Sequence, residues 1–392
     1  MNAAKIEYPN NLTVAEYHEL LTGSAIHPAL IKDNFFHIEG ESVYDYLFIS
    51  DKIPRKNAGR VTDGYIKMYQ HLFLGGTWIQ SLDPFKNWQP MEWGRIKPNF
   101  PRFDWQKGKP VKYESPPKTA NRVTYFDVPN CILNKVARRY NIPDVRQVLF
   151  AKRGKKLHIK SRRKNTAIRN GLRPLRIGFW EWVKQHPEIP IILCEGEKKA
   201  ACLLSLGFVA IALPGIWNGR VGKQDFDERL HPDLVPIAQA GRKFIILFDH
   251  ETKPKTRWSV FQATVRTAKV IESAGCECEV ALLPGPEKGV DDFVVARGED
   301  ANVLLTAIVN DAKSLKDYQR SYRAKKWGLS KYKPDVTVNI KYLTQALSIP
   351  ELEEKCSSAP ALYDLALEKL FTPSIRGAEE QRSRGAEELL SS

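Results

Sequence analysis

The chain lacks the sequence signatures of several protein classes. None of its six cysteines forms a CxxC pair, and their spacing to the histidines fits no zinc-finger pattern. No stretch approaches the roughly 18 apolar residues of a membrane span, and the first residues contain no apolar core of a secretory signal. We therefore expect reduced thiols, no membrane association and a cytoplasmic location.

The composition shows instead an excess of cations. The 392 residues include 60 Lys and Arg against 45 Asp and Glu, which gives a formal net charge of +15, and 43% are hydrophobic. The hydrophobic share is sufficient for a folded core, and the length allows two or three domains. The positive balance favours a polyanionic partner such as DNA, although an ordinary basic enzyme could have the same composition.

Short apolar runs alternate with helical patterns between residues 188 and 312. Apolar runs of five or six residues are typical of strands buried on both faces, as in a parallel sheet. Gly207 and Gly275 follow two of the helical patterns and are expected to end those helices. The alternation predicts an α/β domain with a parallel sheet. The expected strands are 189–194, 208–213, 243–248 and 279–283, and the expected helices are 197–206, 258–274 and 301–312.

Carboxylates follow three of these expected strands. Glu195 ends the first run, Asp249 and Glu251 follow the run at 243–248, and Asp291 comes after the run at 279–283, with Asp292 as an alternate. The carboxyl ends of parallel strands share one edge of a sheet, where open α/β sheets bind ligands. Clustered carboxylates repel one another unless a cation joins them, and oxygen ligands suit Mg²⁺ or Mn²⁺. The pattern predicts a divalent-metal site for phosphate chemistry.

Other charged residues lie beside these carboxylates. Glu197 is interpreted as an acid favoured by the helix dipole in a first turn rather than as a catalytic group. His250 is expected to face away from Asp249. Three lysines are expected to pair with phosphates, although an exposed helix face would also explain the first two. They are Lys198, Lys199 and Lys288.

Two further segments suggest contact with nucleic acid. From 78 to 126, aromatic residues alternate with cations and prolines, which suits stacking on single-stranded DNA; the alternative is a small β-rich core with a basic rim. Residues 151–180 hold 11 cations and no Asp or Glu. Such a segment is expected to bind a phosphate backbone or to form a solvated loop between domains. The cations expected to contact DNA there are Lys155, Lys156, Arg162, Arg163 and Lys164.

Composition divides the chain into four parts. Short helices are expected at 14–21 and 28–35 in the first part. The sequence RGAEE occurs at 376–380 and again at 384–388, which is low-complexity sequence and predicts partial disorder near the end. The parts are an N-terminal α+β domain (1–150), a basic linker (151–187), the parallel-sheet domain (188–312) and a basic helical extension with the low-complexity tail (313–392).

Motifs along the chain resemble known families. A strand followed by Glu-Gly, a strand followed by Asp-x-acid, and a later Asp are similar to the Toprim domains of bacterial primases, topoisomerases and some nucleases. A narrower set resembles the N-terminal half of the cyanobacterial plasmid replication proteins of the CyRepA type, which carry a Toprim-like domain of the DUF3854 type. These motifs are NWQPMEWG at 87–94, KYESPPKT at 112–119, ALPG at 212–215, TKPKT at 252–256 and PDVTVN at 334–339.

The resemblance implies a Toprim-like Rossmannoid sheet and a primase-like nucleotidyl transferase. Its substrates would be nucleoside triphosphates on single-stranded DNA, during replication of a plasmid or mobile element. Glu195 and Asp249 would be the catalytic residues. The Mg²⁺ or Mn²⁺ ligands would be Glu195, Asp249, Glu251 and Asp291.

Two departures from the family pattern leave alternatives open. The usual Asp-x-Asp motif is replaced here by Asp249-His250-Glu251, which moves one carboxylate outward by a methylene. The chain also contains no G-x-x-x-x-G-K-[ST] motif of the kind that larger family members carry in a helicase. The alternatives are a non-catalytic DNA-binding module that works with a helicase in trans, and a metal-dependent nuclease on the same fold.

Overall fold

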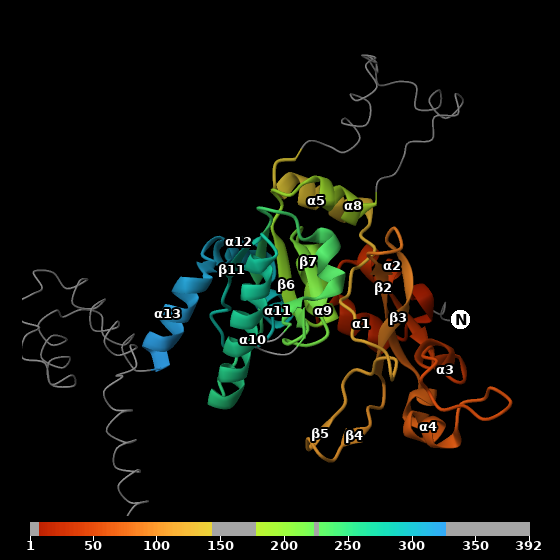
Figure 1. The fold of residues 1–392 in the computed structure, drawn as a ribbon. Coiled ribbons are helices and arrows are strands. Elements are labelled where there is room, and N and C mark those ends of the chain that lie inside the picture. The colour runs from red at the N-terminus through yellow and green to blue at the C-terminus, as the bar shows by residue number, and fades with distance from the viewer. Residues whose placement is uncertain (1–7, 143–177, 223–226, 327–392) are drawn as a thin grey trace, which may run out of the picture. The chain divides into compact units, whose positions relative to one another are not determined.

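The computed structural model describes residues 8–142, 178–222 and 227–326 (Figure 1). The chain divides into two compact units, Met1–Gln319 and Arg320–Ser392, and nearly all of the described residues belong to the first. No helix within the described ranges has the length and apolar character needed to cross a bilayer. The predicted low-complexity tail lies outside the described residues.

A five-stranded sheet forms the second half of the first unit. Its strands are β6 (Ile191–Glu195), β7 (Val209–Leu213), β10 (Lys243–Ile246), β11 (Glu277–Val280) and β12 (Lys313–Ser314). They lie in the order β12-β11-β10-β6-β7. The four longer strands pair in parallel, and β12 pairs antiparallel with β11 at one edge. The fold is therefore mixed α/β around a sheet with a parallel core, in agreement with the apolar runs that predict buried strands.

Helices connect the parallel strands and cover the sheet. α9 (Glu197–Ser205) connects β6 with β7, and α10 (Pro254–Ser273) connects β10 with β11. Gly207 and Gly275 follow these helices with φ of 88° and 80°, the left-handed conformation that commonly ends a helix, as predicted. The other elements here are α8 (Phe179–Gln185), β8 (Arg220–Val221), β9 (Arg229–Leu230), η3 (Pro232–Ile237), α11 (Val290–Arg297), η4 (Gly298–Asp300), α12 (Ala301–Asn310) and α13 (Leu315–Lys326).

The last expected strand and one helix differ from the prediction. The strand expected at 279–283 spans Glu277–Val280, because Cys278 and Val280 are the buried side chains that alternate with more exposed glutamates. α11 was not predicted. It begins after Gly289, whose backbone N–H donates to the Asp292 carboxylate, and the apolar residues of VDDFVVAR do not gather on one face of a helix, so the sequence shows no helical period there.

The N-terminal half of the unit is built on an antiparallel sheet. The sheet order is β1-β2-β3, formed by β1 (Phe35–Ile38), β2 (Gly76–Asp83) and β3 (Gln89–Pro98). α1 spans Val14–Leu21 as predicted, and it begins at a capping box between Thr13 and Glu16. α2 spans Pro28–Asn34, close to the helix predicted at 28–35. The remaining elements are η1 (Pro9–Asn11), α3 (Ser42–Leu47), α4 (Asp63–Met68), η2 (Gln70–Leu74), β4 (Phe103–Asp104), β5 (Lys109–Pro110) and α5 (Asn130–Arg139).

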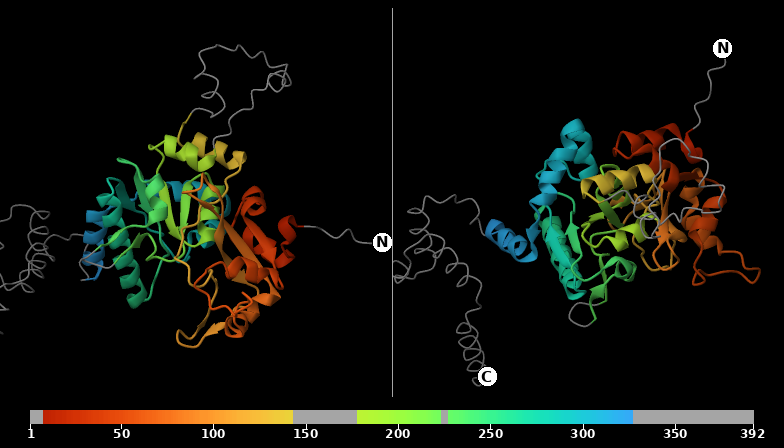
Figure 2. Two further views of the ribbon diagram at one scale, coloured as in Figure 1. Left: turned by 45° about the vertical axis from the view of Figure 1, so that its right-hand side comes forward. Right: turned by 90° about the horizontal axis from the view of Figure 1, so that it is seen from above.

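The two sheets are joined by buried contacts. Trp180 of α8 lies against the ring of Tyr125, with ring centroids 4.8 Å apart, and both side chains are buried. Thr124 pairs with Ala212 of β7 through two backbone hydrogen bonds of 2.9 and 3.2 Å. Figure 2 shows the antiparallel sheet beside the parallel one, with the short β4–β5 hairpin extending from it. The N-terminal residues therefore complete the edge of the parallel sheet.

Candidate functional site

The strand order of the parallel sheet reverses between β6 and β10. From β6 the chain moves outward to β7, and from β10 it moves outward in the other direction to β11. Such a switch point leaves a crevice beyond the carboxyl ends of the two central strands, where open α/β sheets bind ligands. Glu195 is the last residue of β6, and Asp249 follows β10 by three residues. These two carboxylates therefore lie on neighbouring strands at the switch point.

Two lysines pair with carboxylates at this edge. Lys199 of α9 places Nζ 2.5 Å from Asp249 Oδ1, and both side chains are largely buried. Lys288 places Nζ 2.7 Å from Glu251 Oε1. The structure thus brings four of the sequence-predicted residues together, and it pairs each of these two carboxylates with an ammonium group.

The environment of Glu195 alters its acidity. Burial raises the pKa of the Glu195 carboxyl. The carboxylates of Asp249 and Glu251 raise this pKa further, while Lys199 and Lys288 oppose the rise. For Lys199, burial lowers the pKa, but the carboxylates of Asp249, Asp291 and Glu195 together outweigh burial, so the pKa of its ammonium group lies above the usual value. The site therefore keeps Lys199 charged and makes Glu195 a weaker acid than an exposed glutamate.

Asp291 adds a buried carboxylate from α11. Its Oδ2 lies 3.4 Å from the hydroxyl of Ser24, whereas its Oδ1 has no hydrogen-bond partner among the described residues. Burial raises the pKa of Asp291, and Lys199 opposes this rise. A Cβ at Gly289 would lie 2.5 Å from Asp291 Oδ1 and 2.7 Å from Lys199 Cε, so glycine lets these side chains approach the chain closely. An unpaired buried oxygen is unusual in proteins and indicates a group suited to a ligand.

The charges at this edge do not balance. The carboxylates of Glu195, Asp249, Glu251 and Asp291 supply four formal negative charges, and Lys199 and Lys288 supply two positive ones, which leaves an excess of two negative charges. Oxygen donors with this excess fit the chemistry of Mg²⁺ or Mn²⁺. Within residues 8–142, 178–222 and 227–326, however, no three His, Cys, Asp or Glu side chains are arranged to hold a metal ion.

A buried ion pair supports the start of α9. Glu197 is fully buried, and Arg95 of β3 donates from Nη1 to both of its carboxylate oxygens, at 2.8 and 3.1 Å. The Arg95 guanidinium also lies 4.8 Å from the ring centroid of Tyr113. Glu197 occupies the first turn as predicted, but the sequence gives no sign of a partner 102 residues away. Arg95 is thus a neighbour of the site that sequence reasoning did not identify.

Lys198 and His250 also have structural partners. Lys198 Nζ donates to Glu19 Oε1 over 2.9 Å, and Lys97 pairs with the other oxygen of the same carboxylate. His250 Nδ1 lies 3.2 Å from the carbonyl oxygen of Leu283. All three lysines predicted to bind phosphate are therefore paired with carboxylates here.

The predicted DNA-binding cations of the basic linker lie outside the described residues. They are Lys155, Lys156, Arg162, Arg163 and Lys164.

The aromatic stretch from 78 to 126 divides into two groups. Trp78, Trp93, Tyr125 and Phe126 are buried and belong to the core, which is the alternative considered for this stretch. A second group is exposed to solvent and consists of Phe85, Phe100, Phe103 and Trp105. Cations occur near residues of both groups, such as Arg95 near buried Trp93 and Lys107 near exposed Trp105, so a nearby cation does not separate core from surface.

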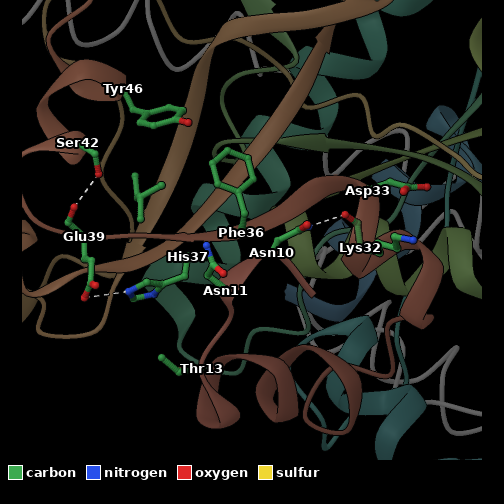
Figure 3. Close-up of a pocket in the computed structure, with 11 residues that line it drawn as sticks. Asn10, Asn11, Thr13, Lys32, Asp33, Phe36, His37, Glu39, Ser42 and Tyr46 are labelled. Carbon is green, nitrogen blue, oxygen red and sulfur yellow. Dashed lines mark hydrogen bonds and ion pairs between the residues drawn. The ribbon is translucent and has the colours of Figure 1, made fainter. Parts of the chain in front are cut away.

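A pocket of about 830 Å³ lies elsewhere, on the N-terminal half of the unit (Figure 3). Its wall comes from η1, α2, β1 and the start of α3. His37 in this wall lies 2.9 Å from the Glu16 carboxylate and 3.4 Å from that of Glu39. The pocket includes none of the sequence-predicted site residues, so it is separate from the carboxylates at the switch point. The lining residues are Asn10, Asn11, Thr13, Lys32, Asp33, Phe36, His37, Ile38, Glu39, Ser42 and Tyr46.

The carboxylates at the switch point coincide with a recognised domain. Residues 179–301 match the model of a domain of unknown function, DUF3854. The match covers α8 to the start of α12, and it includes Glu195, Asp249, Glu251 and Asp291. The expectation of a DUF3854-type domain is therefore confirmed. Arg95 and Glu19, which pair with residues of α9, lie outside the matched range.

A longer similarity extends beyond the DUF3854 match. The chain is 34% identical over 297 residues to an uncharacterised protein of the cyanobacterium Picosynechococcus sp. (strain ATCC 27264 / PCC 7002 / PR-6). The similarity covers 73% of this chain and 27% of that protein. The chain thus matches about a quarter of the length of its longer relative.

Proposed function

We propose that this chain is a Toprim-like DNA replication protein that carries out primase-like, metal-dependent nucleotidyl transfer on single-stranded DNA. The single observation that supports the proposal most strongly is the meeting of Glu195 and Asp249 at the switch point of the parallel sheet. The excess of negative charge around them and the unpaired oxygen of Asp291 are further support. Replication of a plasmid or mobile element is the setting that the resemblance to CyRepA-type proteins suggests.

The proposed cofactor is Mg²⁺ or Mn²⁺. Glu195, Asp249, Glu251 and Asp291 supply only oxygen donors, and their charge excess over Lys199 and Lys288 equals that of one divalent cation. No three of these described side chains are arranged around one ion in the structure, so they would have to move to hold it. When bound, the ion would polarise phosphate oxygens and make a hydroxyl group a better nucleophile. An ion at Asp249 or Glu251 has to replace the ammonium group that each carboxylate contacts in the structure.

The residues of the chain then have distinct roles. The raised pKa of Glu195 makes it a stronger base than an ordinary glutamate, which suits it to accept a proton from an attacking hydroxyl group. Lys199 and Lys288 keep their charge, because carboxylates raise the pKa of both ammonium groups. Once displaced from Asp249 and Glu251, they would pair with the phosphates of a nucleotide.

A second candidate function is a DNA-binding module without catalysis that works with a helicase in trans. The observation that favours it is the pairing of Asp249 with Lys199 and of Glu251 with Lys288, because such ion pairs neutralise the carboxylates without a metal. The replacement of Asp-x-Asp by Asp249-His250-Glu251 points the same way. A metal-dependent nuclease would use the same carboxylates.

The test is primer synthesis on single-stranded DNA by the full chain, with labelled nucleoside triphosphates and either Mg²⁺ or Mn²⁺. Asp249→Asn is compared with Glu279→Gln, which removes a carboxylate that pairs with Lys243 on the surface of the same sheet. We expect metal-dependent product from the wild type and from Glu279→Gln, and none from Asp249→Asn.

The other outcomes separate the candidates. Absence of product with both metals, with a helicase supplied and with DNA binding intact, would favour the non-catalytic module. Nicking of supercoiled DNA that requires metal and Asp249, without primer synthesis, would favour the nuclease. Equal product from Asp249→Asn and wild type would refute the assignment of the site.

A further inference from the structure

The β4–β5 hairpin has an unusual surface. We define the aromatic hairpin as residues 99–112, which follow β3 and contain β4 and β5. Trp105 is 86% exposed, Phe100 is 61% exposed and Phe103 is 44% exposed. The rings of Phe103 and Trp105 contact each other, with centroids 4.8 Å apart. Tryptophan gains more than most residues from burial, so three exposed aromatic side chains on one short hairpin suggest a surface used for binding.

The base of the aromatic hairpin is firmly held. Arg102 donates to both oxygens of Glu114, at 2.6 and 3.2 Å, and the Glu114 side chain also lies 3.5 Å from His71 of η2. Backbone hydrogen bonds of 3.0 and 2.9 Å join Ile96 and Glu114, and Val111 donates to the carbonyl of Arg102 over 2.9 Å. The exposed aromatics are thus carried by an anchored element and are not placed on a loose chain end.

The charge of the aromatic hairpin indicates the kind of partner. It contains four cations, Arg102, Lys107, Lys109 and Lys112, and one acid, Asp104. Lys107 pairs with Asp104 over 3.3 Å. Lys109 and Lys112 are exposed and have no ion-pair partner among the described residues. Flat aromatic faces beside unpaired cations complement a chain of stacked bases joined by phosphates.

We propose that the aromatic hairpin binds single-stranded DNA, with Trp105 and Phe103 stacking on bases and Lys109 and Lys112 contacting phosphates. The proposal deepens the function proposed above and rests on it for the identity of the partner. The hairpin begins four residues after Arg95, which contacts the first turn of α9 beside Glu195.

The test measures the affinity of the full chain for a labelled oligothymidylate of about 20 nucleotides by fluorescence anisotropy. Trp105→Ala is expected to weaken binding by roughly 5- to 150-fold, the equivalent of about 1–3 kcal/mol for one stacked base. Trp105→Phe keeps an aromatic face and should retain most of the affinity. The control Phe85→Ala removes an aromatic side chain that is 59% exposed outside the hairpin and should change little.

The Trp105→Leu variant separates DNA from a protein partner. Leucine is apolar but cannot stack, so it should bind DNA as poorly as alanine, whereas a hydrophobic protein contact would tolerate it. Replacing Lys109 and Lys112 by glutamine should reduce the slope of log affinity against log salt by about 0.7 for each lost phosphate contact. Wild-type affinity in Trp105→Leu, or an equal loss in Phe85→Ala, would overturn the proposal.

The failure of this proposal differs from the failure of the proposed function. Normal DNA affinity in Trp105→Ala, together with loss of primer synthesis in Asp249→Asn, would refute the hairpin and leave the catalytic site standing. If Trp105→Ala binds DNA weakly and the wild-type chain makes no product with either metal, the proposal for the hairpin is supported and the proposed catalysis is refuted.

Discussion

Replacement of Arg95 by leucine should destabilise the fold at the start of α9. The substitution removes both hydrogen bonds that Nη1 donates to Glu197, whose carboxylate is fully buried. Removing one partner of a buried ion pair costs about 3–5 kcal/mol, because the other charge is left without compensation. The favourable position of Glu197 in the first turn of α9 is the same in wild type and variant, so the helix dipole does not change this loss. We therefore expect the free energy of unfolding to fall by about 3–5 kcal/mol.

Urea denaturation of the full chain measures this loss. The Glu197→Met variant and the double variant complete a mutant cycle, since apolar replacement of both partners is often neutral or stabilising. The double variant should recover most of the stability that Arg95→Leu loses. A loss below about 1 kcal/mol in Arg95→Leu, or the same loss in the Glu197→Met background, would refute the reasoning.

Two more predictions concern the switch point, and a third concerns the packing of the antiparallel sheet. Because burial raises the pKa of Asp291, its ionisation destabilises the folded state as pH rises through that pKa. The Asp291→Asn variant should therefore have a Tm about 2 °C above that of the wild type near pH 7 and should lose this advantage near pH 3. The same variant should show no rise in Tm on adding Mg²⁺. The raised pKa of Glu195 predicts that Mg²⁺-dependent stabilisation declines at a pH above the usual glutamate range, and titration of Tm against pH with and without Mg²⁺ checks this; an unchanged Mg²⁺ effect down to about pH 4 would contradict it. A Cβ at Gly94 would lie 2.4 Å from Trp78 Cζ2, so Gly94→Ala should cost about 1–3 kcal/mol in urea denaturation, and a neutral effect would show that the tryptophan can move.

The parallel sheet could be predicted because its signals are local. Runs of buried apolar residues fix the strands, and glycines at 207 and 275 end helices within a few residues of the expected positions. The positions of Glu195 and Asp249 at strand ends follow from the same runs. To predict that the two carboxylates are neighbours also requires the order of the strands, which a parallel α/β pattern suggests but does not determine.

The partners of the charged residues could not be predicted in the same way. Lys199 and Asp249 are 50 residues apart, and Arg95 and Glu197 are 102 residues apart, so only tertiary packing brings them together. The aromatic stretch from 78 to 126 presents a related problem. Its composition is similar throughout, yet Trp78 is fully buried and Trp105 is 86% exposed. Both tryptophans belong to the same stretch rich in aromatic residues, and the sequence alone does not say which one the fold covers.

The two edges of the parallel sheet are partly paired by residues outside the DUF3854 match. β7 is covered where Thr124 pairs with Ala212, and β11 is covered by β12 at Lys313–Ser314. A fragment cut to residues 179–301 would lose both partners and leave further backbone groups unpaired at each edge. Open edges of this kind template strand addition between molecules, so such a fragment should self-associate and aggregate where the longer chain stays dispersed.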